Sequence, residues 1–381
     1  MKRTLILLAA LAMGLQCFAQ GLKAGPWVCD AREDRVTILW TSEVPGLACV
    51  EFEDGTRLHD FKYETFAGRR IFRRLHSVTI DGLERGQVIR YRVMGQNLVD
   101  GSNARNPLFG DSYQSEWHSI GTLDSKAKTC RFSVFNDVHM RVDKYEALAA
   151  GVPRSTDFLF LNGDICSAGN YVLDTAVRYA IEPLGILTPN TPIFFGRGNH
   201  EGRGDNVQLF ADIFPNADPA PFYYTFRQGP VAVIVFDGGE TGRSRSILYS
   251  GGEVSEEYLN EQIEWAKKAV KDPLFRKAPV KICILHVPMI DHPDKSDYML
   301  QRWLNKHFMG LLNKAGIDLM IGADLHEFML CDAGTMGNDF PILVNDDARR
   351  LDVECGAKGP IKVRMFNADG EVEFEQEFPV K

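Results

Sequence analysis

The sequence predicts two domains, an all-β sandwich followed by an α/β domain. The chain has 381 residues, which is more than one typical small domain and enough to bury a substantial core. From Gly25 to about Leu123, short strands are separated by turn-forming residues. After Cys130, strands alternate with amphipathic helices, which indicates βα units and helix-covered sheets. We therefore expect domains at residues 20–124 and 130–381, with the polar residues 124–129 as a linker.

The first domain is expected to be built from short, partly alternating strands. These are residues 36–40, 48–52, 76–80 and 88–93. Residues 83–91 resemble the strand-turn-strand corner of fibronectin type III domains, with Tyr91 as the corner aromatic. This resemblance implies a fibronectin-like β-sandwich.

The second domain is expected to alternate strands and helices and then to end in β-structure. The expected strands are 131–136, 158–162, 192–195, 231–236, 281–285 and 319–321, and the helices between them include 171–186, 255–271 and 298–315. In the tail we expect a strand at 340–344 and a hairpin of 361–366 and 371–378 that turns at residues 367–370.

The N-terminus has the pattern of a secretory signal peptide. Lys2 and Arg3 precede an apolar run over residues 5–15, and small residues before Gln20 suit cleavage after residue 19. The run is too short to span a membrane. A lipid anchor would use Cys17, but Gln16 is a bulky polar residue where a small one is needed. We therefore expect an exported protein, periplasmic or secreted, without a transmembrane span.

Charge and cysteine content narrow the classes of partner. The chain has 43 Lys and Arg and 51 Asp and Glu, a net charge of −8, and these charges are interspersed. This pattern gives no electrostatic footprint for nucleic acid or an anionic membrane, and favours a small or carbohydrate-linked substrate.

Cys130 and Cys283 lie in apolar strands as buried thiols, and Cys29 with Cys49 is the one pair to test for a disulfide. The sequence does not indicate an oligomeric state.

Five polar clusters each follow directly on an apolar strand. They are Asn136-Asp137-Val138-His139, Gly163-Asp164, Gly198-Asn199-His200-Glu201, Leu285-His286-Val287 and Asp324-Leu325-His326. Ligands of open α/β sheets bind at the carboxyl ends of the strands, so these clusters converge if the strands are parallel neighbours. An Asp-x-His pair also places a carboxylate and an imidazole on one face of an extended segment, within reach of one metal. Any single cluster is weak evidence, because a histidine after a strand is more often a surface or capping residue.

In their order and spacing, these clusters resemble the calcineurin-like metallophosphoesterase superfamily, which includes the purple acid phosphatases. That pattern is Asp-x-His, Gly-Asp, Gly-Asn-His-(Glu/Asp), His and Gly-His-x-His, and the match covers about residues 130–327. The resemblance implies a four-layer α/β/β/α domain and two divalent ions. One ion would be held by Asp137, His139, Asp164 and His326, and the other by Asp164, Asn199, His286 and Asp324. The preceding β-sandwich is also similar to the N-terminal domain of purple acid phosphatases.

The same resemblance implies hydrolysis of phosphate mono- or diesters by attack of a metal-bridging hydroxide. His200 would not bind metal but would face the substrate and donate a proton to the leaving oxygen. Arg197 and Arg203 flank this cluster, and His292 lies in the loop after His286, so all three are candidate substrate contacts. For the two arginines, a solvated surface position is an equally good interpretation.

Two positions depart from the family pattern. Asp324 stands where the family has the first histidine of Gly-His-x-His, and a carboxylate there favours Mn, Fe or Mg over Zn. Ser167 stands where many relatives have an aspartate that orients the catalytic histidine, and where purple acid phosphatases have a tyrosine ligand. These departures leave open a non-catalytic, metal-containing binding protein that presents its β-sandwich to glycans or protein partners. Retention of His200 favours the enzyme. A nucleotidase is disfavoured because the tail after Glu327 is too short for a nucleoside-binding domain.

Overall fold

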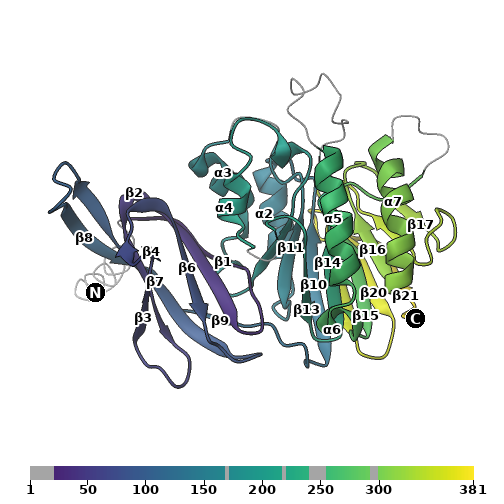
Figure 1. Ribbon diagram of the computed structural model, residues 1–381, viewed down its shortest axis with the longest axis horizontal. Helices are drawn as coiled ribbons and strands as arrows, with labels where there is room; N and C mark the ends of the chain where they lie inside the picture. Colours follow the sequence, from purple (N-terminus) through teal and green to yellow (C-terminus); the bar gives the residue numbers. More distant parts are fainter. Residues whose placement is uncertain (1–20, 168–170, 217–219, 240–254, 292–298) are drawn as a thin grey trace, which may run out of the picture.

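The computed structural model describes residues 21–167, 171–216, 220–239, 255–291 and 299–381. It confirms the predicted fold class, an N-terminal β-sandwich followed by a four-layer α/β/β/α domain (Figure 1). The predicted signal peptide, residues 1–19, lies outside the described residues. In the described parts of the chain, no helix combines the length and the apolar character needed to cross a membrane.

One long strand, β2 (Arg35–Glu53), organises the first domain by taking part in both layers of the sandwich. Its first half pairs with β1 (Leu22–Cys29) and β6 (Arg73–Asp81). Its second half pairs with β3 (Asp60–Tyr63) and β7 (Val88–Asp100). The remaining strands are β8 (Leu108–Gln114) and β9 (His118–Gly121), which pair with β7, and β4 (Thr65–Phe66) and β5 (Arg69–Arg70), which form a separate hairpin. Alternate residues of β2, such as Trp40 and Val50, point into the core.

The sandwich is packed tightly against the second domain. Trp27 and Leu39 belong to the same buried cluster as Phe210 and Ile213 of the second domain. The Trp27 indole donates a hydrogen bond to the Ile213 carbonyl at 2.9 Å. The Tyr91 hydroxyl, on β7, donates to the Pro189 carbonyl at 2.7 Å. The tyrosine expected at a corner of the sandwich is therefore fully buried and bonds to the other domain.

The described cysteines are all free, so the disulfide considered between Cys29 and Cys49 does not form. The two residues lie in different parts of the sandwich. Cys29 ends β1, and its sulfur lies 3.8 Å from the Ile213 carbonyl of the second domain. Cys49 lies in the other half of the sandwich, where it pairs with Tyr63 of β3.

Two six-stranded sheets form the centre of the second domain. The first has the order β12 (Ile193–Gly196), β11 (Phe158–Asn162), β10 (Thr129–Phe135), β19 (Arg350–Gly356), β20 (Ile361–Phe366) and β21 (Val372–Phe378). The second has the order β13 (Tyr224–Gln228), β14 (Val231–Val235), β15 (Val280–Ile284), β16 (Leu319–Gly322), β18 (Ile342–Val344) and β17 (Met329–Cys331). Within the sheets, β10, β11 and β12 are parallel, as are β14, β15, β16 and β18. Both sets therefore offer strand carboxyl ends for a site.

Helices cover the outer face of each sheet (Figure 1). Over the first sheet lie α2 (Val142–Ala150), α3 (Leu173–Ala180) and α4 (Leu209–Ile213), with the short 3-10 turns η1 (Glu182–Leu184) and η2 (His200–Gly202). Over the second lie α5 (Ser255–Ala269), α6 (Pro273–Arg276) and α7 (Met299–Ala315). Successive side chains of a strand point to opposite faces. Val134 therefore packs between the sheets, whereas Phe135 packs under the helices.

Several elements differ from the sequence expectation, among them one helix and the short strands β13, β17 and β19 of the second domain. The helix expected over 171–186 ends at Ala180 and continues only as η1, because Pro183 cannot donate the next backbone hydrogen bond. Strand β19 is absent from the expected strands, although Leu351, Val353 and Cys355 alternate in the manner of a half-buried strand. It pairs antiparallel with β10 and attaches the C-terminal hairpin to the first sheet.

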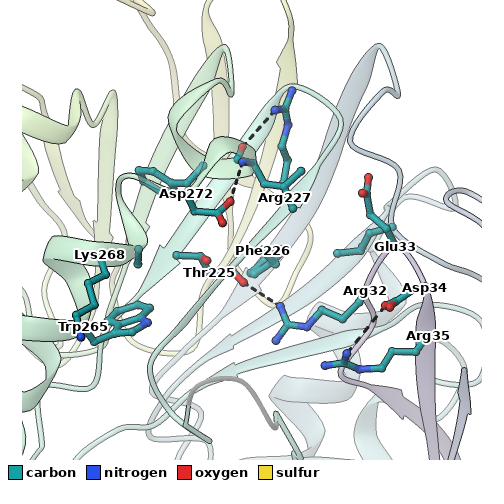
Figure 2. A pocket seen from close by; sticks show the side chains of 14 residues that line it. Arg32, Glu33, Asp34, Arg35, Thr225, Phe226, Arg227, Trp265, Lys268 and Asp272 are labelled. Carbon is teal, nitrogen blue, oxygen red and sulfur yellow. Dashed lines mark hydrogen bonds and ion pairs between the residues drawn. The ribbon is translucent and has the colours of Figure 1, made fainter.

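A pocket of about 680 Å³ lies where the sandwich meets the second domain (Figure 2). Its walls come from the turn between β1 and β2, from β13, from the C-terminal end of α5 and from α6. Its charged lining residues are Arg32, Glu33, Asp34, Arg35, Arg227, Lys268 and Asp272. Positive and negative groups are nearly balanced in this lining, so its charge favours neither an anionic nor a cationic ligand.

We predict that Trp27→Ala lowers the free energy of unfolding by about 3–5 kcal/mol, because it leaves a cavity at the domain junction and removes a hydrogen bond. Trp27→Phe keeps most of the apolar volume and should cost clearly less. Urea unfolding followed by circular dichroism measures both variants. A Trp27→Ala protein that is as stable as the parent would show that the sandwich does not stabilise the second domain.

Candidate metal centre

The five polar clusters meet where the parallel strands of both sheets end. Asp137 and His139 follow β10, Asp164 follows β11, Asn199 and His200 follow β12, His286 follows β15, and Asp324 and His326 follow β16. The expectation that the clusters converge therefore holds, with the difference that they come from two facing sheets.

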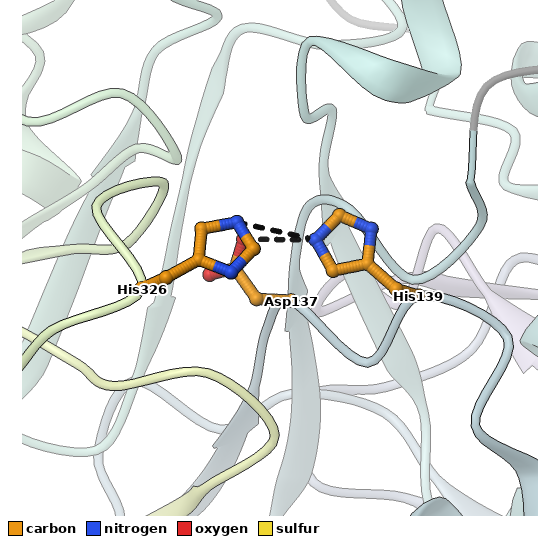
Figure 3. Close-up of side chains that lie close together, drawn as sticks. All are labelled: Asp137, His139 and His326. Atoms are coloured by element: carbon orange, nitrogen blue, oxygen red, sulfur yellow. Dashed lines mark hydrogen bonds and ion pairs between the residues drawn. The ribbon is translucent and has the colours of Figure 1, made fainter.

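The first group of side chains is Asp137, His139 and His326 (Figure 3). The Nε2 atoms of His139 and His326 are 3.3 Å apart. They lie 3.7 Å and 3.6 Å, respectively, from Oδ1 of Asp137. Figure 3 shows the two imidazoles approaching each other from separate loops, with the carboxylate beside them. Three ligand atoms this close together, each on a different side of a small gap, suit a single ion.

The second group centres on one oxygen of Asp164. Its Oδ2 atom lies 3.4 Å from Nε2 of His286 and 3.6 Å from Nε2 of His200. The same oxygen is 3.8 Å from Nε2 of His139, which belongs to the first group. Asp164 therefore lies between the two sets of histidines, in the position of a carboxylate that can serve both.

The backbone is held in an uncommon conformation at these positions. Asp137, His139, Asp164, Asp324 and His326 have φ values of 48°, 50°, 52°, 71° and 54°. Left-handed φ is unfavourable for residues with a Cβ and persists where surrounding structure enforces it, often at functional sites. The tight turns after the strands aim successive polar side chains inward. Gly163 lets the loops approach, since a Cβ there would lie 2.7 Å from the His286 ring.

The electrostatics of the cluster suit a cation. Oδ1 of Asp137 is buried and has no hydrogen-bond donor within the described residues. Burial alone would lower the pKa of His286, but the carboxylates of Asp164 and Asp137 outweigh it and raise that pKa well above its ordinary value. Burial raises the pKa of Asp324 to about 6, and Asp137 and Asp164 add to this effect while His286 opposes it. Divalent ions would supply the missing positive charge and displace the proton on His286.

Neighbouring groups fix the orientation of the imidazoles. Nδ1 of His286 donates to the Asn162 carbonyl at 2.7 Å, which leaves Nε2 available to a metal. Nδ1 of His326 faces Asp347 at 3.7 Å, which is longer than a hydrogen bond, and that carboxylate accepts a hydrogen bond from Arg141 at 2.8 Å. Asp347 belongs to none of the predicted clusters, although it follows β18 as the clusters follow their strands.

Asp324 is oriented by a residue that no sequence pattern indicates. Gln301, on α7, donates from its amide to Oδ2 of Asp324 at 3.1 Å. The other oxygen of Asp324 lies 3.8 Å from Nε2 of His286. The carboxylate therefore points toward the cluster, as a ligand at this position requires.

Glu201 connects the loops that carry the second group. It is completely buried, and its carboxylate accepts from the backbone N–H groups of Asp164 at 2.9 Å and of Cys166 and Gly198 at 3.0 Å. Burial and the nearby Asp164 raise the pKa of Glu201, whereas these donors stabilise its ionised form. The sequence motif included Glu201 but assigned it no role; the structure shows that it holds the ends of β11 and β12 together.

His200 lies at the open side of the cluster and is paired with Arg203. Nη1 of Arg203 lies 3.0 Å from Nε2 of His200. The Asn199 amide lies 3.1 Å from Asp164 and 2.8 Å from Nη2 of Arg203, and both contacts are hydrogen bonds when its nitrogen faces Asp164. A metal ligand role for Asn199 requires the opposite orientation of this amide.

Arg197 and His292 are the two other candidate substrate contacts. Arg197 forms an ion pair with the buried Asp237 at 2.7 Å, and its guanidinium lies over the rings of Phe222 and Tyr258. These contacts tie β12 to the end of β14. His292 lies outside the described residues.

The fold and the cluster of carboxylates and imidazoles define a metallophosphoesterase, a metal-dependent hydrolase of phosphate esters. The sequence model of the calcineurin-like phosphoesterases matches residues 130–328, more than half of the chain. The protein therefore belongs to the calcineurin-like phosphoesterase family. No curated protein matches the chain in sequence.

Two solved structures have a similar fold over nearly the whole chain. The purple acid phosphatase PPD1 from seeds of yellow lupin (Lupinus luteus) has a TM-score of 0.69 and 12% sequence identity, covering 95% of this chain and 75% of the lupin chain. PhoD has a TM-score of 0.63 and 10% identity, covering 96% of this chain and 92% of its own. At these identities the likeness concerns the fold, which is of the purple acid phosphatase type.

We predict that Glu201→Gln weakens metal binding about tenfold and lowers stability by about 1–3 kcal/mol, because an amide cannot accept at both of its ends. Metal titration by calorimetry and urea unfolding measure the two effects. Glu146→Gln, on the exposed face of α2, is the matched control and should change neither. Unaltered metal affinity in Glu201→Gln would show that the loop connection does not position the ligands.

Proposed function

We propose that this protein is exported and hydrolyses phosphate mono- or diesters with two divalent ions. The proposed ligands are Asp137, His139, Asp164, Asn199, His286, Asp324 and His326. The observation that carries this proposal is the position of Asp164, whose single oxygen Oδ2 lies within 3.8 Å of a histidine from each group. A carboxylate placed between two groups of ligands is what a bridged pair of ions needs. Export rests on the predicted signal peptide.

The chemistry divides between the ions and the protein. When bound, a pair of divalent ions stabilises charge on the phosphoryl group and lowers the pKa of the attacking water. The protein holds ligands in fixed orientations through hydrogen bonds from or to Asn162, Gln301 and Glu201. This preorganisation spares the reaction the cost of reorienting charged side chains.

His200 is the proposed proton donor to the leaving oxygen. Because Arg203 is a donor only, Nε2 of His200 accepts from it in the structure. For His200 to donate from this atom, the guanidinium must leave it. A bound phosphate offers Arg203 a stronger, charge-assisted partner. We therefore propose that Arg203 moves to a phosphate oxygen and frees Nε2 of His200, and we favour Arg203 over Arg197 as a phosphate contact.

The proposal is tested by metal content and hydrolysis together. We expect purified protein to bind two divalent ions and to hydrolyse para-nitrophenyl phosphate or its bis-ester when supplied with Mn, Fe, Zn or Mg. Asp164→Ala should lose both ions and reduce turnover by about a hundredfold or more, since the bridging carboxylate serves both. Asp212→Ala, exposed on α4, is the control. Bound ions without turnover of either ester would instead support the non-catalytic binding protein.

Asp324 provides a separate prediction about metal preference. We expect Asp324→His to shift the activating metal from Mn or Mg toward Zn, because an imidazole is a softer ligand than a carboxylate. The ion at Asp137 and His139 should stay bound. Activation profiles over the four metals and metal analysis measure the shift, with Asp332→His on the surface as the control. The same profile in the variant and the parent would mean that Asp324 binds no metal.

A further inference from the structure

Exposed apolar side chains are concentrated on the sandwich rather than on the larger second domain. Of the fifteen large hydrophobic residues that are exposed in the described chain, nine lie between residues 44 and 108. The most exposed of them at one end of the sandwich are Phe66, Val99 and Leu108, with 74%, 63% and 58% of their surface accessible. Apolar side chains gathered in this way on a water-soluble fold mark an interaction surface.

Two hairpins joined by β2 bring these residues together, and the β7–β8 hairpin lies at the end of the sandwich away from the second domain (Figure 1). The β4–β5 hairpin carries Phe66, and the β7–β8 hairpin carries Val99 and Leu108. Gly46 of β2 pairs with both Asn97, before the β7–β8 turn, and Arg73, just after the β4–β5 hairpin. The rings of Phe72 and Phe109 join the two hairpins, with centroids 5.3 Å apart. We call this region the distal surface and define it as Phe66, Arg69, Arg70, Phe72, Val99 and Leu108.

The distal surface adds positive charge to its apolar groups. Residues 65–73, Thr-Phe-Ala-Gly-Arg-Arg-Ile-Phe-Arg, contain three arginines and no acidic residue, in a chain whose net charge is −8. Arg73 is paired with Glu64. Arg69 and Arg70 are exposed and have no carboxylate partner among the described residues; Arg70 lies over the Tyr63 ring. The neighbouring β7–β8 hairpin carries the exposed acidic residues Asp100, which pairs with Leu108, and Asp111, so the positive charge is confined to the β4–β5 hairpin.

We propose that the distal surface binds the surface of an anionic lipid bilayer. Phenylalanine and aliphatic side chains can enter the boundary between headgroups and acyl chains, while neighbouring arginines bind lipid phosphates. Phe66, Phe72, Val99 and Leu108 offer no hydrogen-bonding group, which disfavours a glycan as the occupant.

The interspersed charges of the sequence predict no electrostatic attraction to an anionic membrane. The folded structure changes this prediction. In the folded chain, one short hairpin presents Arg69 and Arg70, which have no carboxylate partner among the described residues, beside exposed apolar groups. The proposed contact is independent of the metal centre, which lies on the second domain. A bilayer bound there would hold the enzyme at the membrane without covering the strand ends that carry the site.

Vesicle sedimentation of the chain from Gln20 to Lys381 tests the proposal. We expect binding to phosphatidylcholine vesicles that contain about 30% phosphatidylglycerol, and much weaker binding to phosphatidylcholine alone or at high salt. Phe66→Ser with Val99→Ser and Leu108→Ser should reduce the partition coefficient about tenfold or more. Arg69→Gln with Arg70→Gln should reduce it by a similar factor, about fivefold for each arginine.

Matched controls distinguish vesicle binding by the distal surface from nonspecific vesicle binding. Ile186→Ser with Val372→Ser removes two exposed apolar residues of the second domain, and Arg276→Gln removes an exposed arginine on α6. Both controls should bind vesicles as the parent does, and all variants should keep parent phosphoesterase activity in solution. The proposal is overturned if the parent ignores anionic vesicles at low salt, if the distal variants bind like the parent, or if the parent binds an acidic polysaccharide and no vesicles.

Discussion

The structure depends above all on keeping several carboxylates and imidazoles within a few ångströms of one another inside a folded protein. Asp137 and Asp164 are almost completely buried, and one oxygen of Asp137 has no donor among the residues that the structure describes. Burying unpaired negative charge is costly, so such a cluster persists only if a cation completes it or if protonation of neighbours relieves it. The raised pKa of His286 is the second of these responses. The rest of the fold holds these groups in place against their mutual repulsion.

The supporting contacts come from the first sheet and from α7. Glu201 fastens two loops of the first sheet, Asn162 orients a histidine of the second, and Gln301 holds Asp324 from a helix. Gln301 and Asn162 bond directly to the side chains of proposed ligands, whereas Glu201 bonds to the backbone of the loops that carry them. Such contacts orient ligands before a metal binds.

The sequence predicted the fold class and the converging clusters because both follow from short-range patterns. Apolar strands were recognised from composition, and polar residues directly after them identified strand ends. Gln301 could not be found in this way, since a glutamine on an amphipathic helix has no distinguishing pattern and acts only through a contact 23 residues away along the chain. The Arg203 contact to His200 and the pairing of Arg197 with Asp237 depend likewise on side-chain directions that the sequence does not fix. The disulfide considered between Cys29 and Cys49 does not form, because β2 belongs to both layers of the sandwich. The sequence pattern does not show that one strand takes part in both layers.

The hydrogen bond from Tyr91 to Pro189 bears on whether the two domains can be separated. The backbone N–H of Ser119, in the sandwich, also donates a hydrogen bond to the Asn190 side chain at 3.0 Å. Two hydrogen bonds therefore hold the segment that leads into β12. That strand ends at the loop of Asn199 and His200. Removing the sandwich would therefore release the approach to this loop and expose the apolar surface that now covers Trp27. The boundary near residue 124 separates two architectures, but it does not separate two independent folding units. The sandwich is a structural part of the hydrolase.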